Sequence, residues 1–170
     1  MSDTPASTSP RVVRPSDARC EMTQIVLPGD CNALDTAFGG KVMSWVDICA
    51  AVACQRFTRT TVVTAAMDSL SFKAPIRRGN VAVIQATVNR AWNTSMEVGV
   101  RVEEECPTTG VRVHTSTAYL TFVALDDQHE LTHVPVLEPH TDLERRRWRE
   151  AQLRRDARLS VRTQVEAGRA

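Results

Sequence analysis

One carboxylate stands out because its neighbours in the sequence are apolar. Asp47 lies within Phe38–Phe57, where apolar side chains recur at the i, i+3/i+4, i+7 spacing of one helix face. An unpaired carboxylate is costly to bury, so Asp47 needs either a partner from a distant segment, such as Thr64 or Ser69, or a chemical role. The chemical role open to such a carboxylate is that of a general base or a nucleophile.

Two adjacent glycines, Gly39 and Gly40, stand at the start of the same helix. The first turn of a helix leaves backbone N–H groups without partners and carries the positive end of the helix dipole. Because glycine has no side chain, a substrate oxygen can approach these donors closely, and we predict that the Gly40 N–H polarises a substrate carbonyl. The alternative is that both glycines only permit tight packing of the helix on a sheet.

The elements that position these residues follow from the hydrophobic pattern. After the helix the period changes to two, which is typical of strands. Strands are expected at Glu21–Leu27, Thr61–Phe72, Val81–Asn89, Thr94–Glu105 and Val111–Leu125. The last four are joined by short turns, which connect antiparallel neighbours, and one helix against one antiparallel sheet is an α+β fold. Since the helix is apolar on nearly all sides, we expect the sheet to curl around it and bury it.

A single domain is expected over residues 19–127, between a disordered tail (1–18) and a Pro-punctuated linker (128–140). Residues 141–170 then form a charged, Arg-rich helix and tail. A weak apolar stripe on this helix is expected to rest on the domain or on a neighbouring subunit; it consists of Leu143, Trp148, Ala151 and Leu159. Acidic residues interrupt the arginines, which disfavours nucleic-acid binding by this helix.

Composition places the chain among ordinary globular proteins. The 170 residues are 42% hydrophobic and carry a net charge of +1, which gives no reason to expect a nucleic acid or a membrane as partner. The five cysteines form no C-x-x-C pair, so we expect reduced, buried thiols such as Cys49 and Cys54, no metal site and a cytoplasmic location. Met1–Pro10 lacks the basic start and apolar run of a secretory signal.

Several segments together resemble the hotdog-fold acyl-CoA thioesterases of the cytosolic acyl-CoA hydrolase type. In that family an Asn-led loop ends in Phe-Gly-Gly and a helical Asp follows seven residues later; the matching residues here are Asn32, Phe38, Gly39, Gly40 and Asp47. Further matches follow in order at Val63-Thr64, Phe72–Pro75 with Gly79, Thr94–Val98 and Thr121–Asp126. The resemblance covers about residues 20–127.

The resemblance implies a hotdog fold, in which the sheet curls around one central helix, and hydrolysis of acyl-CoA thioesters. Asn32 would orient the water or the thioester carbonyl; its alternative role is that of a turn residue capping its loop. Active sites in this family form between two subunits, where Asn32 of one chain meets Asp47 of the other. A dimer is therefore implied, and further a trimer of dimers. CoA is part of the substrate, so no separate cofactor is implied.

Basic and hydroxyl side chains should line the groove that binds the CoA phosphates. The substrate- and CoA-binding candidates are Phe38, Gly39, Arg77, Arg78, Thr94 and Ser95, with Arg90 and His114 behind them. The polar candidates are equally well interpreted as solvated turn or strand residues.

The chain departs from the family pattern at two positions. Asp35 replaces a loop glycine, and Asp tolerates positive φ better than most residues. Trp92 replaces a glycine before Thr94-Ser95, and its ring is expected to cover or narrow the groove.

Other functions have weaker support. No G-x-S-x-G motif indicates a serine hydrolase, and Gly39–Val42 lacks the upstream Gly and the following Ser or Thr of a phosphate-binding loop. A hotdog dehydratase would need a catalytic His, and all four histidines lie outside the helix and its loop. A non-catalytic acyl-CoA-binding or regulatory hotdog module is the main alternative, and the presence of both Asn32 and Asp47 argues against it.

Overall fold

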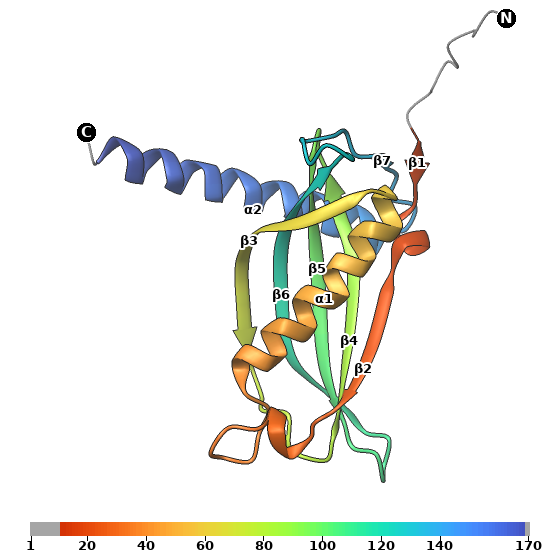
Figure 1. Cartoon of the computed structure of the whole chain (residues 1–170), viewed down its shortest axis with the longest axis vertical. Coiled ribbons are helices and arrows are strands. Elements are labelled where there is room, and N and C mark those ends of the chain that lie inside the picture. The colour runs from red at the N-terminus through yellow and green to blue at the C-terminus, as the bar shows by residue number, and fades with distance from the viewer. Residues whose placement is uncertain (1–10, 169–170) are drawn as a thin grey trace, which may run out of the picture.

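A five-stranded antiparallel sheet covers one side of the long helix α1 (Gly39–Thr58) in this computed structural model, which describes residues 11–168. The strand order is β2-β4-β5-β6-β3, with β2 at Cys20–Ile25, β3 at Thr61–Phe72, β4 at Val81–Ala91, β5 at Ser95–Glu105 and β6 at Arg112–Leu125. Figure 1 shows α1 lying diagonally across the sheet. The predicted α+β fold is confirmed, and the strands differ from the predicted ones only at their ends.

The central strands place apolar side chains on the face towards α1. On β5 these are Met96, Val98, Val100 and Val102, all buried as their period of two predicts. Cys49 and Cys54 of α1 are fully buried in the same core, and burial raises the pKa of the Cys49 thiol to about 12. Both cysteines therefore pack as small apolar residues, as predicted.

Only one side of α1 is buried, which corrects the expectation of a helix enclosed on all sides. Val42 and Trp45 pack in the core, whereas Met43 and Ile48 are 42% and 50% exposed. A five-stranded sheet twists without closing, so one chain covers only the helix face that touches it. The opposite face of α1 leaves apolar side chains uncovered.

The segment 11–18, expected within a disordered tail, is ordered. Strand β1 (Val12–Val13) pairs in parallel with β7 (Val136–Leu137), and the short 3-10 helix η1 (Pro15–Ala18) follows it. Burial of Val13 and Ala18 in the core outweighs the polar composition of this segment. The rest of the predicted tail, residues 1–10, lies outside the described part of the chain.

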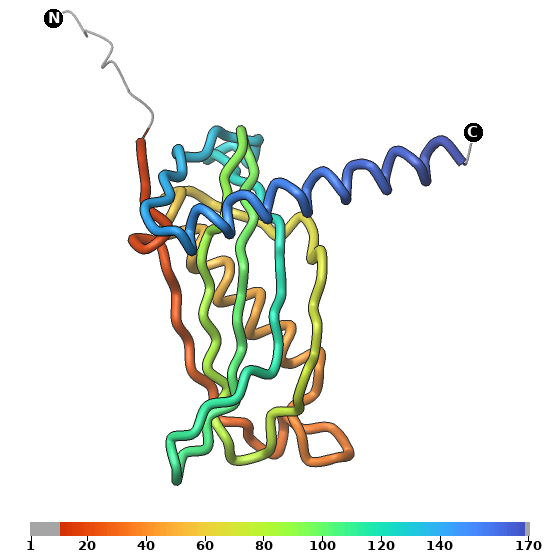
Figure 2. The backbone as a smooth tube through the Cα atoms, turned by 180° about the vertical axis from the view of Figure 1, so that it is seen from behind, coloured from red at the N-terminus to blue at the C-terminus, as the bar shows by residue number. Residues whose placement is uncertain are grey.

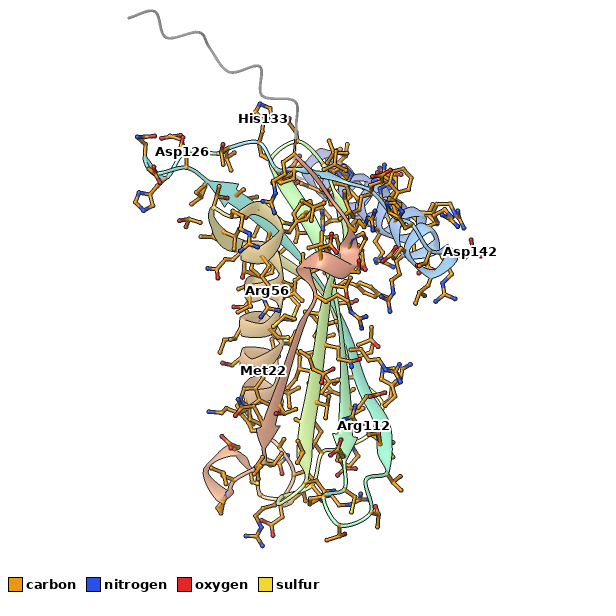
Figure 3. The ribbon with its side chains drawn as sticks, turned by 90° about the vertical axis from the view of Figure 1, so that its right-hand side faces the viewer. Met22, Arg56, Arg112, Asp126, His133 and Asp142 are labelled. Carbon is orange, nitrogen blue, oxygen red and sulfur yellow. The ribbon has the colours of Figure 1, made fainter. Side chains whose placement is uncertain are left out.

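A second long helix, α2 (Asp142–Ala167), lies on the other face of the sheet. Figure 2 shows it crossing this outer face and running on beyond the sheet, and the side view of Figure 3 places α1 and α2 on opposite sides. Of the predicted apolar stripe, Trp148 and Ala151 face the domain, whereas Leu143 and Leu159 are each 45% exposed. Among residues 11–168, no helix is long and apolar enough to cross a bilayer.

Charged and aromatic contacts dock α2 on the sheet. Arg154 donates to both carboxylate oxygens of the buried Glu97, at 2.7 and 3.0 Å, and lies 3.7 Å from the centroid of the Tyr119 ring. Further along the helix, Arg158 pairs with Asp68. Because a buried carboxylate is tolerated only when it is paired, the position of α2 is tied to the polar face of the sheet.

Candidate active site

Asn32 organises the loop that leads into α1. Its Oδ1 accepts hydrogen bonds from the amides of Leu34 and Thr36, at 2.9 and 3.3 Å, and its Nδ2 donates to the Thr36 hydroxyl at 3.0 Å. Asn32 thus makes the contacts of a turn residue, which was the alternative considered for it. Its side chain is nevertheless exposed, and within residues 11–168 only one of the two Nδ2 hydrogens has an acceptor.

Asp35 follows in the same loop with a φ of 56°, in the left-handed region that favours glycine. The Arg78 amide donates to the Asp35 carbonyl at 3.1 Å, and the two side chains lie 3.5 Å apart. The Arg77 amide donates to the buried carboxylate of Glu104 at 2.8 Å. The predicted CoA-binding arginines therefore sit on a turn that contacts the Asn32 loop.

The N-terminus of α1 offers two backbone donors. Among the described residues no side chain caps the helix, and the amides of Gly39 and Gly40 have no acceptor. A Cβ at Gly40 would stand 2.5 Å from Phe38 Cε1, whereas one at Gly39 would meet Phe72 Cζ only at 3.6 Å. A side chain at position 40 would therefore displace the exposed Phe38 ring, whereas position 39 has room for a Cβ.

A groove of about 390 Å³ opens beside this end of the helix. It is lined by Asn32, Ala37, Gly39 and the segment 72–75. Nearby, Lys41 lies 3.2 Å from the carboxylate of Asp30, and a hydrogen bond from the Leu27 amide lowers the pKa of that carboxyl. The short helix η2 (Pro28–Asp30) thus contacts the first turn of α1 through this ion pair.

Asp47 is half-buried in the middle of α1 and contacts β3. The Thr64 hydroxyl donates to its Oδ1 at 2.6 Å, so Thr64, rather than Ser69, is the partner from a distant strand. Within residues 11–168, Oδ2 of Asp47 has no hydrogen-bond partner. One oxygen of the carboxylate is held in place while the other is free to act on a substrate.

Within one chain, Asp47 lies too far from the helix N-terminus for both to act on one bond. Asp47 is seven positions after Gly40, and a rise of 1.5 Å per residue places the two about 10 Å apart along the helix axis. Proton transfer and oxyanion stabilisation both need contacts of about 3 Å to the reacting atoms. These two groups could therefore act on the same bond only if they came from different chains.

The remaining predicted residues lie elsewhere in the chain. Ser95 stands at the β4–β5 hairpin, at the opposite end of the sheet from Asn32, and accepts a hydrogen bond from Arg155 at 3.3 Å; Thr94 precedes it. Arg90 stacks on Trp148 at 3.5 Å. Ser95 and Arg90 thus contact α2, and neither they nor Thr94 line the groove of their own chain.

Two further residues, Trp92 and His114, do not line the groove of their own chain. Trp92 stacks under Arg155 at 4.3 Å and donates to Gln152 at 3.0 Å, and it is not among the residues lining the groove of its own chain. His114 bonds the Thr117 hydroxyl of its own strand at 2.8 Å.

Sequence reasoning missed Glu104, which anchors the Arg77 turn and is only 5% exposed. The sequence contained an indication of this role. Glu104 lies an even number of residues from Val100 and Val102 on β5, so its side chain is on the same side of the strand as theirs, which face the core. A carboxylate at a core-facing position indicates a buried hydrogen-bonding role.

Comparison with known proteins identifies the fold and the family. The profile of the thioesterase superfamily matches residues 34–111. The chain is 38% identical over 128 residues to an uncharacterized acyl-CoA thioester hydrolase of Bacillus subtilis strain 168, YkhA, a match that covers 75% of this chain and 74% of that protein. An acyl-CoA hydrolase of Staphylococcus aureus, solved in complex with butyryl coenzyme A, superposes with a TM-score of 0.85 at 32% identity and covers 92% of this chain and 96% of its own. The chain belongs to the hotdog-fold acyl-CoA thioester hydrolases.

Other acyl-CoA thioester hydrolases add detail. Three further solved forms of the S. aureus hydrolase carry alanine in place of an Asn, an Asp or a Thr, and the separations of these residues along that chain equal those of Asn32, Asp47 and Thr64 here. A solved relative with 36% identity and a TM-score of 0.85, covering 88% of this chain and 96% of its own, is a hexameric acyl-CoA thioesterase.

Some relatives are much longer than this chain. It matches only 24% of the length of mouse acyl-coenzyme A thioesterase 11, at 35% identity over 144 residues and 83% of this chain. It matches 36% of human cytosolic acyl coenzyme A thioester hydrolase, at 30% identity over 137 residues and 79% of this chain.

Proposed function

We propose that this chain hydrolyses acyl-CoA thioesters to a free carboxylic acid and CoA. The observation that carries the proposal is the uncapped N-terminus of α1, whose Gly39 and Gly40 amides adjoin the groove lined by Asn32. Fixed N–H donors of this kind stabilise the charge that develops on a carbonyl oxygen in acyl transfer. Membership of the acyl-CoA thioester hydrolases supports the same reaction.

In the proposed reaction the Gly40 N–H donates to the thioester oxygen, and the Asn32 amide orients the carbonyl or the attacking water. Asp47 takes a proton from that water as its oxygen attacks the carbonyl carbon. When the tetrahedral intermediate collapses, the C–S bond breaks and the CoA thiolate leaves. Asp47 then gives its proton to the thiolate. In the alternative route Asp47 attacks the carbonyl carbon itself, the C–S bond breaks as CoA thiolate leaves, and water then hydrolyses the resulting anhydride to the carboxylic acid and free Asp47.

The proposed site needs two chains, with Asn32 and Gly40 supplied by one and Asp47 by the other. The helix face that carries Asp47 also carries the exposed Met43 and Ile48, and uncovered apolar surface is typical of an interface. The 12-residue strand β3 lies at the edge of the sheet, where its outer backbone groups are available to a second copy. Closed two-fold dimers are the commonest assembly, and the hexameric relative supports a trimer of such dimers.

Arg77 and Arg78 are proposed to bind the phosphates of CoA. Their side chains are 69% and 52% exposed beside the Asn32 loop, so each retains free guanidinium donors despite its contact with a carboxylate. Phe38, 59% exposed at the start of α1, offers an apolar surface to the substrate. Thr94, Ser95, Arg90 and His114 stay predictions, and Thr94 and Ser95 would reach the groove only from another chain.

A cytoplasmic location is proposed for this reaction. It is supported by the cytosolic human relative and by the free thiols of all five cysteines.

The proposal is tested by the release of free thiol from a panel of acyl-CoAs, read with a thiol reagent against an enzyme-only blank. Asp47→Asn is expected to lower kcat by about 100-fold or more, because it removes the proton acceptor. Asp127→Asn removes the same charge from an exposed turn and is expected to keep the wild-type rate. Asn32→Ala is expected to lower the rate less than Asp47→Asn, because the helix N-terminus still binds the carbonyl.

The main alternative gives a different result in the same experiments. If the wild-type chain releases no thiol from any acyl-CoA yet binds CoA in calorimetry, it is a non-catalytic acyl-CoA-binding module. A chain that turns over acyl-CoA equally well with Asp47→Asn would also contradict the mechanism.

A further inference from the structure

A second cavity lies on the outer face of the sheet, away from α1 and the groove. Its floor consists of two cross-strand rows that the antiparallel register places side by side, Gln85–Arg101–Thr117 and Thr87–Gly99–Tyr119. The glycine is required here, because a Cβ at Gly99 would stand 2.6 Å from Asn89 Nδ2. The polar side chains of β4, β5 and β6 therefore surround a hollow in the sheet surface at Gly99.

The walls of this cavity come from α2 and from the segment before β2. Arg146, Arg147 and Glu150 lie on one face of α2, and Arg19 faces them from the start of the domain. The cavity measures about 190 Å³, whereas a water molecule in the liquid occupies about 30 Å³. No residue proposed above for acyl-CoA hydrolysis lines it.

Positive charge exceeds negative charge in this cavity. Arg101 pairs with Glu103 and Arg146 with Glu150. Within residues 11–168, the side chains of Arg19 and Arg147 form neither an ion pair nor a hydrogen bond. Burial, together with repulsion from Arg19 and Arg146, lowers the pKa of Arg147. These guanidinium groups are thus held close together without enough carboxylates to balance them.

We propose that this cavity binds a small molecule through its phosphate group. Guanidinium groups offer paired N–H donors whose geometry matches phosphate oxygens. The hydroxyls of Thr87 and Tyr119 add donors from the floor, and neither has a hydrogen-bond partner among the described residues. A tetrahedral phosphate presents oxygens to the floor and to both walls at once, which a planar carboxylate does not. The bound ligand would contact α2, the Arg19 segment and the sheet at the same time, and so would stabilise their packing.

Calorimetric titration of the full chain with inorganic phosphate and with inorganic pyrophosphate at low ionic strength tests the proposal. One site per chain is expected, with acetate giving no binding. Arg147→Met is expected to weaken binding about tenfold or more, because it removes a charge-assisted donor. Arg149→Met removes the same charge from an exposed position of α2 outside the cavity, and is expected to change the Kd by less than about twofold because distant surface charges are screened.

A second variant guards against a folding defect. Tyr119→Phe keeps the ring on which Arg154 stacks and removes only the hydroxyl, so it is expected to stay folded and to bind more weakly than wild type. Pyrophosphate is further expected to raise the Tm of wild type and Arg149→Met but not of Arg147→Met.

Three outcomes would overturn the proposal. The first is no binding of either anion. The second is equal weakening by Arg147→Met and Arg149→Met, which would mark unspecific attraction to a basic surface. The third is binding that survives Arg147→Met but is lost in Arg78→Ala, which would place the anion in the proposed CoA groove.

Discussion

Asp47 and Thr64 are the pair of residues on which the proposed chemistry most directly depends. The Thr64 hydroxyl holds one oxygen of the carboxylate at 2.6 Å. A hydrogen bond to a charged group contributes about 1.5–3 kcal/mol. If that energy serves to aim the free oxygen at the reacting atoms, its loss should appear in the chemical step.

Thr64→Val keeps the shape of the side chain and removes the hydroxyl. We expect kcat for acyl-CoA hydrolysis to fall about 10- to 100-fold, which is the hydrogen-bond energy expressed as a rate, with little change in KM. Thr61→Val, on the same strand and without contact to Asp47, is the matched control. A fall in KM alone, or equal effects of both variants, would contradict a positioning role for Thr64.

Cys106 is expected to be the most reactive thiol of this chain at neutral pH. Hydrogen bonds from Thr108, whose hydroxyl lies 3.2 Å from the sulfur, and from Thr109 lower the pKa of Cys106 to about 7. The rate of alkylation by iodoacetamide, followed by peptide mass spectrometry, should therefore rise with pH and level off above about 7, since the thiolate is the nucleophile.

Two controls accompany this measurement. In Cys106→Ser, the part of the alkylation that rises with pH around 7 should be absent. The buried Cys49 and Cys54 should react with iodoacetamide only after unfolding. A midpoint near the ordinary value of 9.0 would show that the threonines do not stabilise the thiolate.

Among the elements, α2 depends most on its contacts with the outer face of the sheet. Glu97 lies on that face with only 2% of its side chain exposed, and Arg154 is its cationic partner. Removal of one member of a buried pair leaves a charge without compensation, which costs about 3–5 kcal/mol.

Arg154→Met should accordingly lower the free energy of unfolding, measured in urea, by about 3–5 kcal/mol. Arg149→Met should have little effect because Arg149 is exposed. The double variant Glu97→Gln/Arg154→Met should recover part of the loss, since the buried charge is gone. If the double variant is no more stable than Arg154→Met alone, the ion pair is not what holds α2 in place.

The sequence predicted the elements whose own side chains carry a period. The strands from Thr61 to Leu125 show a sequence period of two, and this period was enough to place them along the chain. The order of residues 11–18 was not predictable, because it depends on pairing with Val136–Leu137 far along the chain. The docking of α2 on the sheet was also not predictable. The sequence does not distinguish an arginine in solvent from one that stacks on an aromatic ring far along the chain.

The candidate site was predictable to a similar degree. Asn32, Gly40 and Asp47 stand out by residue type, and the resemblance to a family supplied their roles. The exposed side of α1 was not foreseen, because an apolar helix gives the same pattern whether its own sheet or another chain covers it.

For the molecule as a whole, the division of the proposed site between two chains has a measurable consequence. In a two-fold dimer, a chain with Asn32→Ala and a chain with Asp47→Ala combine into one site with both defects and one with none. Random pairing of equal amounts, after unfolding and refolding together, should restore about a quarter of the wild-type activity. The control is each variant refolded alone, and a mixture no more active than its components would place the whole site in one chain.

Asp47 follows Gly40 by seven positions on α1, and the division of the proposed site that results from this spacing also determines how a defective gene copy affects a normal one. In the proposed dimer, a chain altered at Asn32 alone, or at Asp47 alone, inactivates one site when it pairs with a normal chain and leaves the other site active. A chain altered at both Asn32 and Asp47 inactivates both sites of any dimer that contains it. Two changes that are each close to recessive are therefore dominant-negative when one copy of the gene carries both.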